Sequence, residues 1–230
     1  MRSEKFVAGP RRNINSLDYW NRRFVTGDWA RLDGHQQTRS FAEAQVPLYG
    51  LPRDFAGSLC DFGCGAGDAF PVYKAAFPRA SLTGIDFSAG AIELARERHG
   101  SIAAFVCGDI RAVPRFDVIV CSNVLEHIED DLGLARQLRE RCGTLLLVVP
   151  YREQNLIDEH LRAYDEHSFD ALNPVRHDVF CARGWSEFGL DLYWHIHAKN
   201  IARAVVRRRL RRRKQQVIFE FGQLSNAPHS

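Results

Sequence analysis

The chain of 230 residues is 45% hydrophobic and 26% charged, with a formal net charge of +3. This is the length and composition of one globular domain with a substantial core. The longest apolar run, 145–149, is too short to cross a membrane, and the first residues lack the apolar stretch of a signal peptide. Six cysteines without a C-x-x-C pair indicate reduced thiols, so we expect a cytoplasmic protein.

The positive charge is concentrated in one segment. Residues 199–214 contain nine basic residues and no acid, which leaves 22 basic against 28 acidic residues elsewhere in the chain. An acidic body with one basic strip predicts a local anionic partner. Three interpretations stay open: a solvated helix, contact with an anionic membrane or lipid-linked acceptor at the inner face of the membrane, or contact with RNA phosphates. Because no RNA-binding module accompanies the strip, a membrane surface is favoured over nucleic acid.

In chain order, residues 1–13 are expected to form a flexible basic arm, and residues 14–230 a single domain. Residues 14–52 are expected to be helical. Ser16 can cap a first helix that carries Leu17, Trp20 and Phe24 on one face, and 36–48 predicts a second helix. An aromatic stripe of this kind usually packs a helix against a core.

Strand and helix patterns then alternate, which predicts an α/β fold with a mostly parallel sheet and helices on both faces. Residues 57–150 would form a ligand-binding core, and 151–230 would supply loops, the last strands and a basic helix at 199–214. Strands are expected at 58–62, 82–85, 102–106, 116–121, 144–149, 190–197 and 216–221, the last antiparallel, and helices at 68–77, 88–99 and 130–141.

A glycine loop follows the first strand, with the sequence D-F-G-C-G-A-G-D at residues 61–68. Glycines allow positive φ and let a ligand touch bare backbone. The spacing G-x-G-x-G differs from the G-x-G-x-x-G of dinucleotide sites, and Asp61 and Asp68 would repel a pyrophosphate at the start of the next helix. A cationic ligand without phosphate fits better, and S-adenosylmethionine is such a ligand.

Asp86 ends the second strand, roughly 20 residues after the loop, where a carboxylate can accept both ribose hydroxyls. With the glycine loop and the segment G-I-D-F-S at 84–88, the chain resembles the class I, Rossmann-like, S-adenosylmethionine-dependent methyltransferases. The resemblance is strong over 57–149 and looser to 169. It implies a seven-stranded sheet in the order 3-2-1-4-5-7-6, with the cofactor at the switch point between the first and fourth strands.

The resemblance also implies which residues meet the cofactor. Asp109 would accept from the adenine amine, Ile110 would pack on the ring, and Asn123 and Val124 would line the methionine part. The N-terminal helices would form a lid, with Trp20 over the cofactor. The full set is Trp20, Asp61, Gly63, Cys64, Gly65, Gly67, Asp86, Phe87, Asp109, Ile110, Asn123 and Val124.

His127 follows the fourth strand and would lie near the reacting methyl. Because imidazole titrates near neutral pH, His127 is either the general base for a hydroxyl acceptor or half of a structural E-H pair. Candidate acceptor-binding residues lie in the polar loop after the fifth strand: Tyr151, Arg152, His160, Tyr164 and His167.

No metal ion is expected. Asp158, Glu159 and His160 offer donor atoms, as in catechol-type methyltransferases, but nothing else in the chain matches that subgroup. His195 and His197 are two residues apart on a predicted edge strand, so they share one face, and no third ligand accompanies them. We expect both of these histidines on the protein surface.

The sequence therefore predicts a methyltransferase that uses S-adenosylmethionine to modify an oxygen of a small metabolite or of a glycan or lipid-linked acceptor. Three alternatives stay open: an RNA methyltransferase that uses 199–214, an NAD-dependent oxidoreductase, and a non-catalytic docking protein of the same fold. The loop spacing and the flanking acids argue against NAD. The intact cofactor motifs argue against a non-catalytic role.

Overall fold

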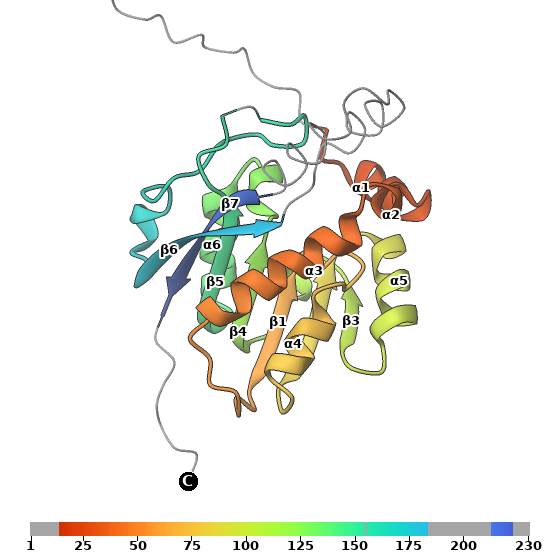
Figure 1. Cartoon of the computed structure of the whole chain (residues 1–230), viewed down its shortest axis with the longest axis horizontal. Helices are drawn as coiled ribbons and strands as arrows, with labels where there is room; N and C mark the ends of the chain where they lie inside the picture. The colour runs from red at the N-terminus through yellow and green to blue at the C-terminus, as the bar shows by residue number, and fades with distance from the viewer. Residues whose placement is uncertain (1–13, 155, 184–212, 223–230) are drawn as a thin grey trace, which may run out of the picture.

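The computed structural model describes residues 14–154, 156–183 and 213–222, drawn in colour in Figure 1. The predicted arm at 1–13, the predicted strand at 190–197 with His195 and His197, and residues 199–212 of the basic strip lie outside these ranges. Within the described ranges, helices flank one sheet. No helix in this part of the chain is long and apolar enough to cross a membrane.

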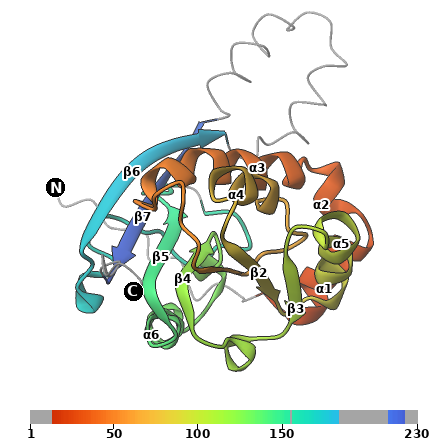
Figure 2. The ribbon, with the colours of Figure 1, turned by 90° about the horizontal axis from the view of Figure 1, so that it is seen from below.

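Seven strands form the sheet. They are β1 (Ser58–Phe62), β2 (Ser81–Asp86), β3 (Ala104–Cys107), β4 (Phe116–Ser122), β5 (Cys142–Pro150), β6 (Arg176–Arg183) and β7 (Arg213–Phe221). Their order is β3-β2-β1-β4-β5-β7-β6, which confirms the order implied by the family resemblance. β1 to β5 are parallel, whereas β7 is antiparallel to both β5 and β6. Figure 2 shows β6 and β7 at the edge of the sheet away from β3.

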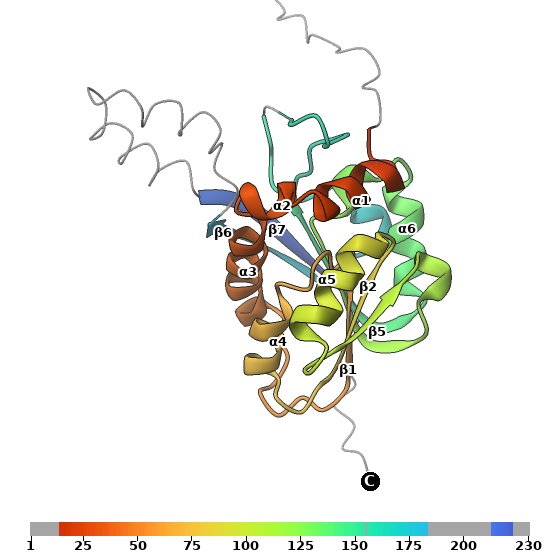
Figure 3. The ribbon, with the colours of Figure 1, turned by 90° about the vertical axis from the view of Figure 1, so that its right-hand side faces the viewer.

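The helices are α1 (Leu17–Val25), α2 (Asp28–Arg31), α3 (Gly34–Gln45), α4 (Phe70–Ala76), α5 (Ala89–His99) and α6 (Asp131–Arg139), with 3-10 turns η1 (Val46–Leu48), η2 (Ile110–Ala112), η3 (Leu125–His127) and η4 (Asp170–Leu172). They cover both faces of the sheet because the central strands are apolar on both sides. Ile119 of β4 packs in one core layer with Leu138 of α6. Val120 faces the opposite layer with Phe70 and Ile92. Figure 3 shows α3 and α4 on one side of the sheet and α6 on the other.

The N-terminal helices lie at the carboxyl edge of the parallel strands, where α1 packs beside α5 (Figure 1). Ser16 caps α1 as expected, because its hydroxyl accepts from the amide of Tyr19 at 3.2 Å. Phe24 is buried as expected, but Leu17 is 51% exposed, so it does not share the buried face. Leu17 belongs to none of the hydrophobic clusters of the described residues, whereas Trp20 and Phe24 pack in the cluster beneath α1.

Two element predictions need correction. The helix after the glycine loop begins at Phe70 rather than at 68, because Gly67 has a φ of +76° and the chain is still turning there. The edge strand β6 at Arg176–Arg183 was not predicted. Its sequence, R-H-D-V-F-C-A-R, carries charges among its apolar residues, as edge strands often do, so it lacks the apolar run of a central strand.

Candidate active site

A cavity of about 340 Å³ lies at the carboxyl ends of β1, β2 and β4. This is the switch point of the sheet, where ligands bind in open α/β folds. All the predicted cofactor contacts except Gly67 line the cavity, and so does His127. The helices α1, α2 and α3 contribute the remaining wall, including Trp20, Phe24 and Trp29.

Contacts between side chains hold this helical layer against the sheet. Gln45 of α3 is buried and donates from Nε2 to the hydroxyl of Ser122 at 2.9 Å. His35, at the start of α3, lies 2.7 Å from the Asp68 carboxylate beside the glycine loop. Asn21 of α1 accepts from the amide of Gly90 at 2.8 Å. The cavity wall is therefore attached at both α1 and α3.

The glycine loop needs its glycines for two different reasons. Gly63, Gly65 and Gly67 all have positive φ, at +79°, +52° and +76°. A Cβ on Gly63 would lie 2.3 Å from Val124, and a Cβ on Gly65 would lie 3.2 Å from the ring of Phe24. A Cβ on Gly67 would instead lie 3.0 Å from the Phe105 ring, in the core. Gly67 is thus required for packing, whereas Gly65 keeps the cavity floor bare.

Asp86 connects the glycine loop to α5. Its side chain is buried, and its two oxygens accept from the amides of Gly65 and Ser88, both at 2.9 Å. Burial raises the pKa of this carboxyl, and the two amide hydrogen bonds oppose that rise. A carboxylate oxygen has more than one lone pair, so Asp86 can still accept from a ligand in the cavity that it lines.

Asp61 is the most perturbed acid of the cavity wall. It is buried at the end of β1, with the Tyr73 hydroxyl 3.4 Å away. Burial raises its pKa to about 7, helped by the neighbouring charge of Asp86 and opposed by the Tyr73 hydrogen bond. A cation in the cavity would stabilise the ionised form of Asp61.

The charge of the cavity wall is one-sided. Asp61, Asp86 and Asp109 all line it, and no lysine or arginine does among the residues that the structure describes. A pyrophosphate inside the cavity would meet the carboxyl groups of Asp61 and Asp86 with no basic side chain beside them among the described lining residues, whereas a ligand with positive groups would be attracted.

Asp109 has a partner that the sequence did not predict. Arg111 donates to its carboxylate from Nε at 3.0 Å and from the guanidinium end at 2.6 Å. This pairing holds the pKa of Asp109 at about 2. Both side chains are solvent-exposed, so Asp109 is an ionised acceptor at the rim of the cavity rather than in its interior.

His127 lies in η3, directly after β4, with its ring against Trp20 at a centroid distance of 4.9 Å. Its Nδ1 lies 3.0 Å from the carbonyl oxygen of Glu159. A carbonyl oxygen only accepts, so Nδ1 carries the proton and Nε2 carries a lone pair. Burial, together with the neighbouring His160, lowers the pKa of His127 to about 4. The ring is therefore neutral at physiological pH.

The five predicted acceptor residues do not form one site. None of them lines the cavity, and only His160 reaches His127, at a ring centroid distance of 5.1 Å. Tyr151 and Arg152 both bond to Glu166. The remaining two contacts are Tyr164 to Asp131 at 2.8 Å, where the tyrosine is buried, and His167 to Asp170 at 3.1 Å on the surface.

Three glutamates lie beside His127 or His160: Glu126, Glu153 and Glu159. The sequence indicated Glu126 only as half of the E-H pair and Glu159 only as a possible metal donor, and it did not indicate Glu153. Glu126 is buried beneath His127, and Glu153 lies 2.5 Å from Nδ1 of His160. Glu126 had a signal, because it precedes His127 in the E-H pair. Glu153 had none, since it lies in a loop without periodic pattern, and no pattern indicated the contact of the Glu159 carbonyl oxygen with His127.

Comparison with known proteins agrees with this geometry. Residues 60–144 match the family model of a methyltransferase domain. The mitochondrial ubiquinone biosynthesis O-methyltransferase of Schizosaccharomyces pombe is 27% identical over 156 residues, which cover 59% of this chain and 54% of that protein. The trans-aconitate 2-methyltransferase of Paracidovorax citrulli is 42% identical over 62 residues, 27% of this chain and 24% of that protein. The chain spans between about a quarter and about half of the length of the curated relatives it matches.

Solved structures show the same fold. The plantazolicin methyltransferase BpumL, in complex with S-adenosylhomocysteine, superposes with a TM-score of 0.56 at 20% identity, covering 91% of this chain and 92% of its own. The chain therefore has the fold of the class I, Rossmann-like methyltransferases, and its residues 60–144 are similar to a methyltransferase domain.

Proposed function

We propose that the chain binds S-adenosylmethionine in the cavity and transfers its methyl group to an oxygen of an acceptor molecule. One observation carries the proposal: a bare glycine loop lines the same cavity as the buried acids Asp61 and Asp86, with Asp109 at its rim, and no lysine or arginine lines this cavity among the described residues. The cofactor, when bound, supplies a methyl group already activated on a positively charged sulfur.

The wall residues suit the parts of this cofactor. Asp61 would hold the ammonium group, and Asp86 the ribose hydroxyls. Asp109 would accept from the adenine amine at the rim, with Ile110 against the ring. Trp20 of α1 would cover the cofactor and exclude water from it. The remaining contacts would come from Gly63, Cys64, Gly65, Phe87, Asn123 and Val124.

His127 is proposed as the catalytic residue at the acceptor. Its Nε2 lone pair can accept the proton of an acceptor hydroxyl, because Nδ1 is already committed to the Glu159 carbonyl. A neutral imidazole of low basicity supplies a modest share of the acceleration. Holding the acceptor oxygen in line with the methyl group, away from water, supplies most of it.

The accepting atom and the acceptor class are part of the proposal. The relative from Schizosaccharomyces pombe is named an O-methyltransferase, which supports oxygen. The acceptor is a small metabolite or a glycan or lipid-linked molecule, bound beside His160 in the segment 151–168. Of the other candidates in that segment, Tyr151, Arg152 and His167 would reach an acceptor only from outside the cavity, and Tyr164 is buried against Asp131.

The basic strip at 199–214 supports a location in the cytoplasm with contact to an anionic membrane. Each basic residue near such a surface contributes about 1 kcal/mol of attraction. Liposome flotation and RNA gel shift at one ionic strength separate the two anionic partners. Replacement of Arg207, Arg208, Arg209, Arg211 and Arg212 by Gln should abolish liposome binding and leave cofactor binding intact.

Transfer of a radioactive methyl group tests the proposed activity. The full chain is incubated with labelled S-adenosylmethionine and separate pools of small metabolites, glycans, lipids and RNA. We expect label in the metabolite, glycan or lipid pool, and at least about tenfold less of it with the Asp86→Asn variant when the cofactor is limiting. Label in RNA alone would favour the RNA alternative. A chain that binds cofactor but labels no pool would fit a docking protein instead.

A further inference from the structure

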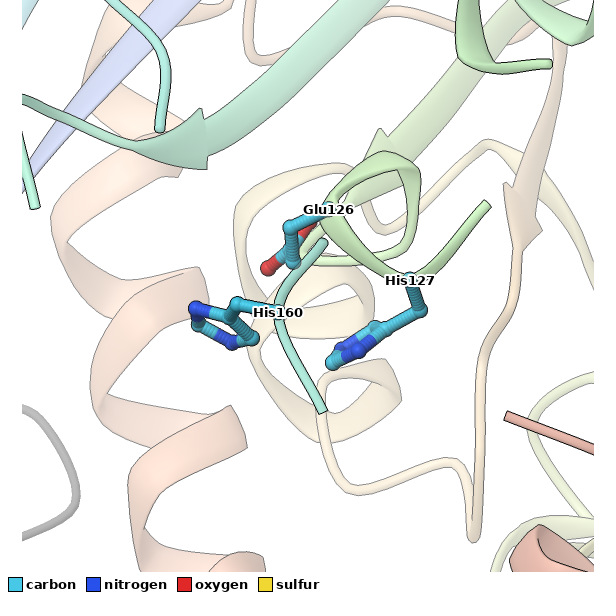
Figure 4. A group of neighbouring side chains, drawn as sticks. All are labelled: Glu126, His127 and His160. Atoms are coloured by element: carbon cyan, nitrogen blue, oxygen red, sulfur yellow. The ribbon is translucent and has the colours of Figure 1, made fainter. Parts of the chain in front are cut away.

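Three side chains that can ligate a metal ion meet beside the cavity. Glu126 and His127 leave the turn after β4, and His160 approaches from the loop after β5 (Figure 4). One donor atom from each residue lies within 4.8 Å of the other two. More than thirty positions separate His127 from His160, and they include α6 and β5, so no local sequence spacing predicts the group.

Both imidazoles are oriented as in metal sites. Nδ1 of His127 is committed to the carbonyl oxygen of Glu159 at 3.0 Å, and Nδ1 of His160 to the Glu153 carboxylate at 2.5 Å. In each ring Nε2 is therefore the nitrogen left for a ligand. Histidines that bind metals almost always donate their other N–H to a carbonyl or carboxylate, which fixes the tautomer and the ring direction.

The carboxylate completes the donor set. Glu126 is only 1% exposed, and its Oε2 has no hydrogen-bond partner among the described residues. An unpartnered buried oxygen costs free energy unless something compensates it. His160 does not compensate it through a hydrogen bond, although the two side chains are close. A cation between them would.

We infer that Glu126, His127 and His160 bind one divalent transition-metal ion of the zinc class. Two imidazoles and a carboxylate suit zinc and its neighbours in the first transition row better than magnesium or calcium. The three donor atoms lie at most 4.8 Å apart, so an ion equidistant from them in their plane would lie at most about 2.8 Å from each. Bonds of about 2.0–2.2 Å then require each donor to move inward by less than about 1 Å.

The metal site would also take part in the proposed methyl transfer, and only this part of the inference rests on the proposed function. Of the three proposed ligands, His127 lines the cavity whereas Glu126 and His160 do not, so the ion would adjoin the cavity at His127. The Nε2 lone pair of His127 would then be used by the ion, and the ion would polarise the acceptor oxygen in its place. The favoured acceptor is one whose hydroxyl or carboxylate oxygen ligates a metal.

Calorimetric titration with Zn²⁺ tests the site on the full chain after treatment with a chelator. We expect one ion per chain, with affinity reduced at least tenfold in Glu126→Gln and in His160→Gln. His167→Ala is the matched control, because this histidine lies in the same loop and pairs with Asp170 on the surface. It should bind zinc as the unmodified chain does. Absence of stoichiometric zinc, or equal affinity in all variants, overturns the inference.

A second measurement needs no variant. Proton NMR of the Co²⁺-loaded chain should show two strongly shifted, solvent-exchangeable signals, one for the Nδ1–H of each histidine ligand. Any other number contradicts the proposed ligand set. Titration of the same samples with S-adenosylhomocysteine tests the proposed function separately. Binding of S-adenosylhomocysteine without binding of zinc would contradict the metal site but not the methyltransferase proposal.

Discussion

The ring of His127 is connected to the carbonyl oxygen of Glu159 by a hydrogen bond of 3.0 Å. The same carbonyl accepts from the side-chain amide of Asn15 at 2.8 Å. The Glu159 carboxylate accepts from the Tyr19 hydroxyl at 2.6 Å and pairs with Arg23. One residue of the loop after β5 thus joins the turn after β4 to helix α1, and it orients the proposed catalytic histidine while it holds the cavity cover.

Glu159→Gln should destabilise the fold through its side chain alone. The backbone contact to His127 stays, but the part-buried pair with Arg23 loses its charge. We expect the free energy of unfolding to fall by about 1–3 kcal/mol in urea denaturation. Glu166→Gln is the control, since its partner Arg152 is 59% exposed and the pair should contribute less than about 1 kcal/mol. Equal losses in the two variants would contradict the role given to Glu159.

Asp86→Asn should weaken the binding of S-adenosylhomocysteine by about 1.5–3 kcal/mol, or roughly 10- to 150-fold, because it removes a charged acceptor from the ribose. The asparagine oxygen still accepts from one of the two amides that Asp86 holds, at Gly65 or Ser88. Circular dichroism should therefore be unchanged. A folded variant with full affinity would show that Asp86 serves the loop and not the ligand.

The pKa of about 7 at Asp61 predicts how cofactor affinity varies with pH. Below pH 7 the carboxyl is protonated in the free protein and must lose its proton to pair with the ammonium group. Affinity for S-adenosylhomocysteine should therefore rise by up to about tenfold per unit between pH 5.5 and 7, then level off. Calorimetry over this range should give a flat profile for Asp61→Asn. An equal rise in that variant would assign the titration to another group.

The parts of the site that sequence could predict are those with a fixed local pattern. The glycine loop at 61–68 and Asp86 at the end of β2 follow buried strands, so their place in the cavity could be expected. Strand β6 could not be predicted from the sequence, since an edge strand has no continuous apolar run. The contacts in the loop after β5 could not be predicted either. Tyr164 and Arg152 bond to Asp131 and Glu166, which come near them only in the folded chain.

Gly65→Val should abolish cofactor binding in a folded protein. The position has a φ of +52°, and a side chain there would enter the cavity toward Phe24. Gly27→Val is the matched control for backbone strain: its φ is +76°, but nothing lies within 4 Å of an added Cβ. We expect both variants to lose stability to a similar extent in thermal denaturation, and only Gly65→Val to lose S-adenosylhomocysteine in calorimetry. If both variants lost S-adenosylhomocysteine binding, backbone strain rather than a side chain in the cavity would explain the loss in Gly65→Val.

His127→Ala should lower turnover by about 10²-fold, near the lower end of general-base effects, because a neutral imidazole of low basicity accepts a proton weakly. Affinity for S-adenosylhomocysteine should change by less than about twofold. Steady-state rates at saturating acceptor give the first value and calorimetry the second. A loss below about tenfold in rate would leave positioning of the acceptor as the source of the acceleration.

The central claim is that the cavity, which is lined by acidic side chains and the glycine loop, binds an adenosyl ligand with a positively charged amino-acid end rather than a dinucleotide. Calorimetric titration of the unmodified chain with S-adenosylhomocysteine and, separately, with NAD at pH 7.5 tests it most directly. We predict one site for S-adenosylhomocysteine, weakened in Asp86→Asn, and no heat from NAD. Binding of NAD without binding of S-adenosylhomocysteine would contradict the account.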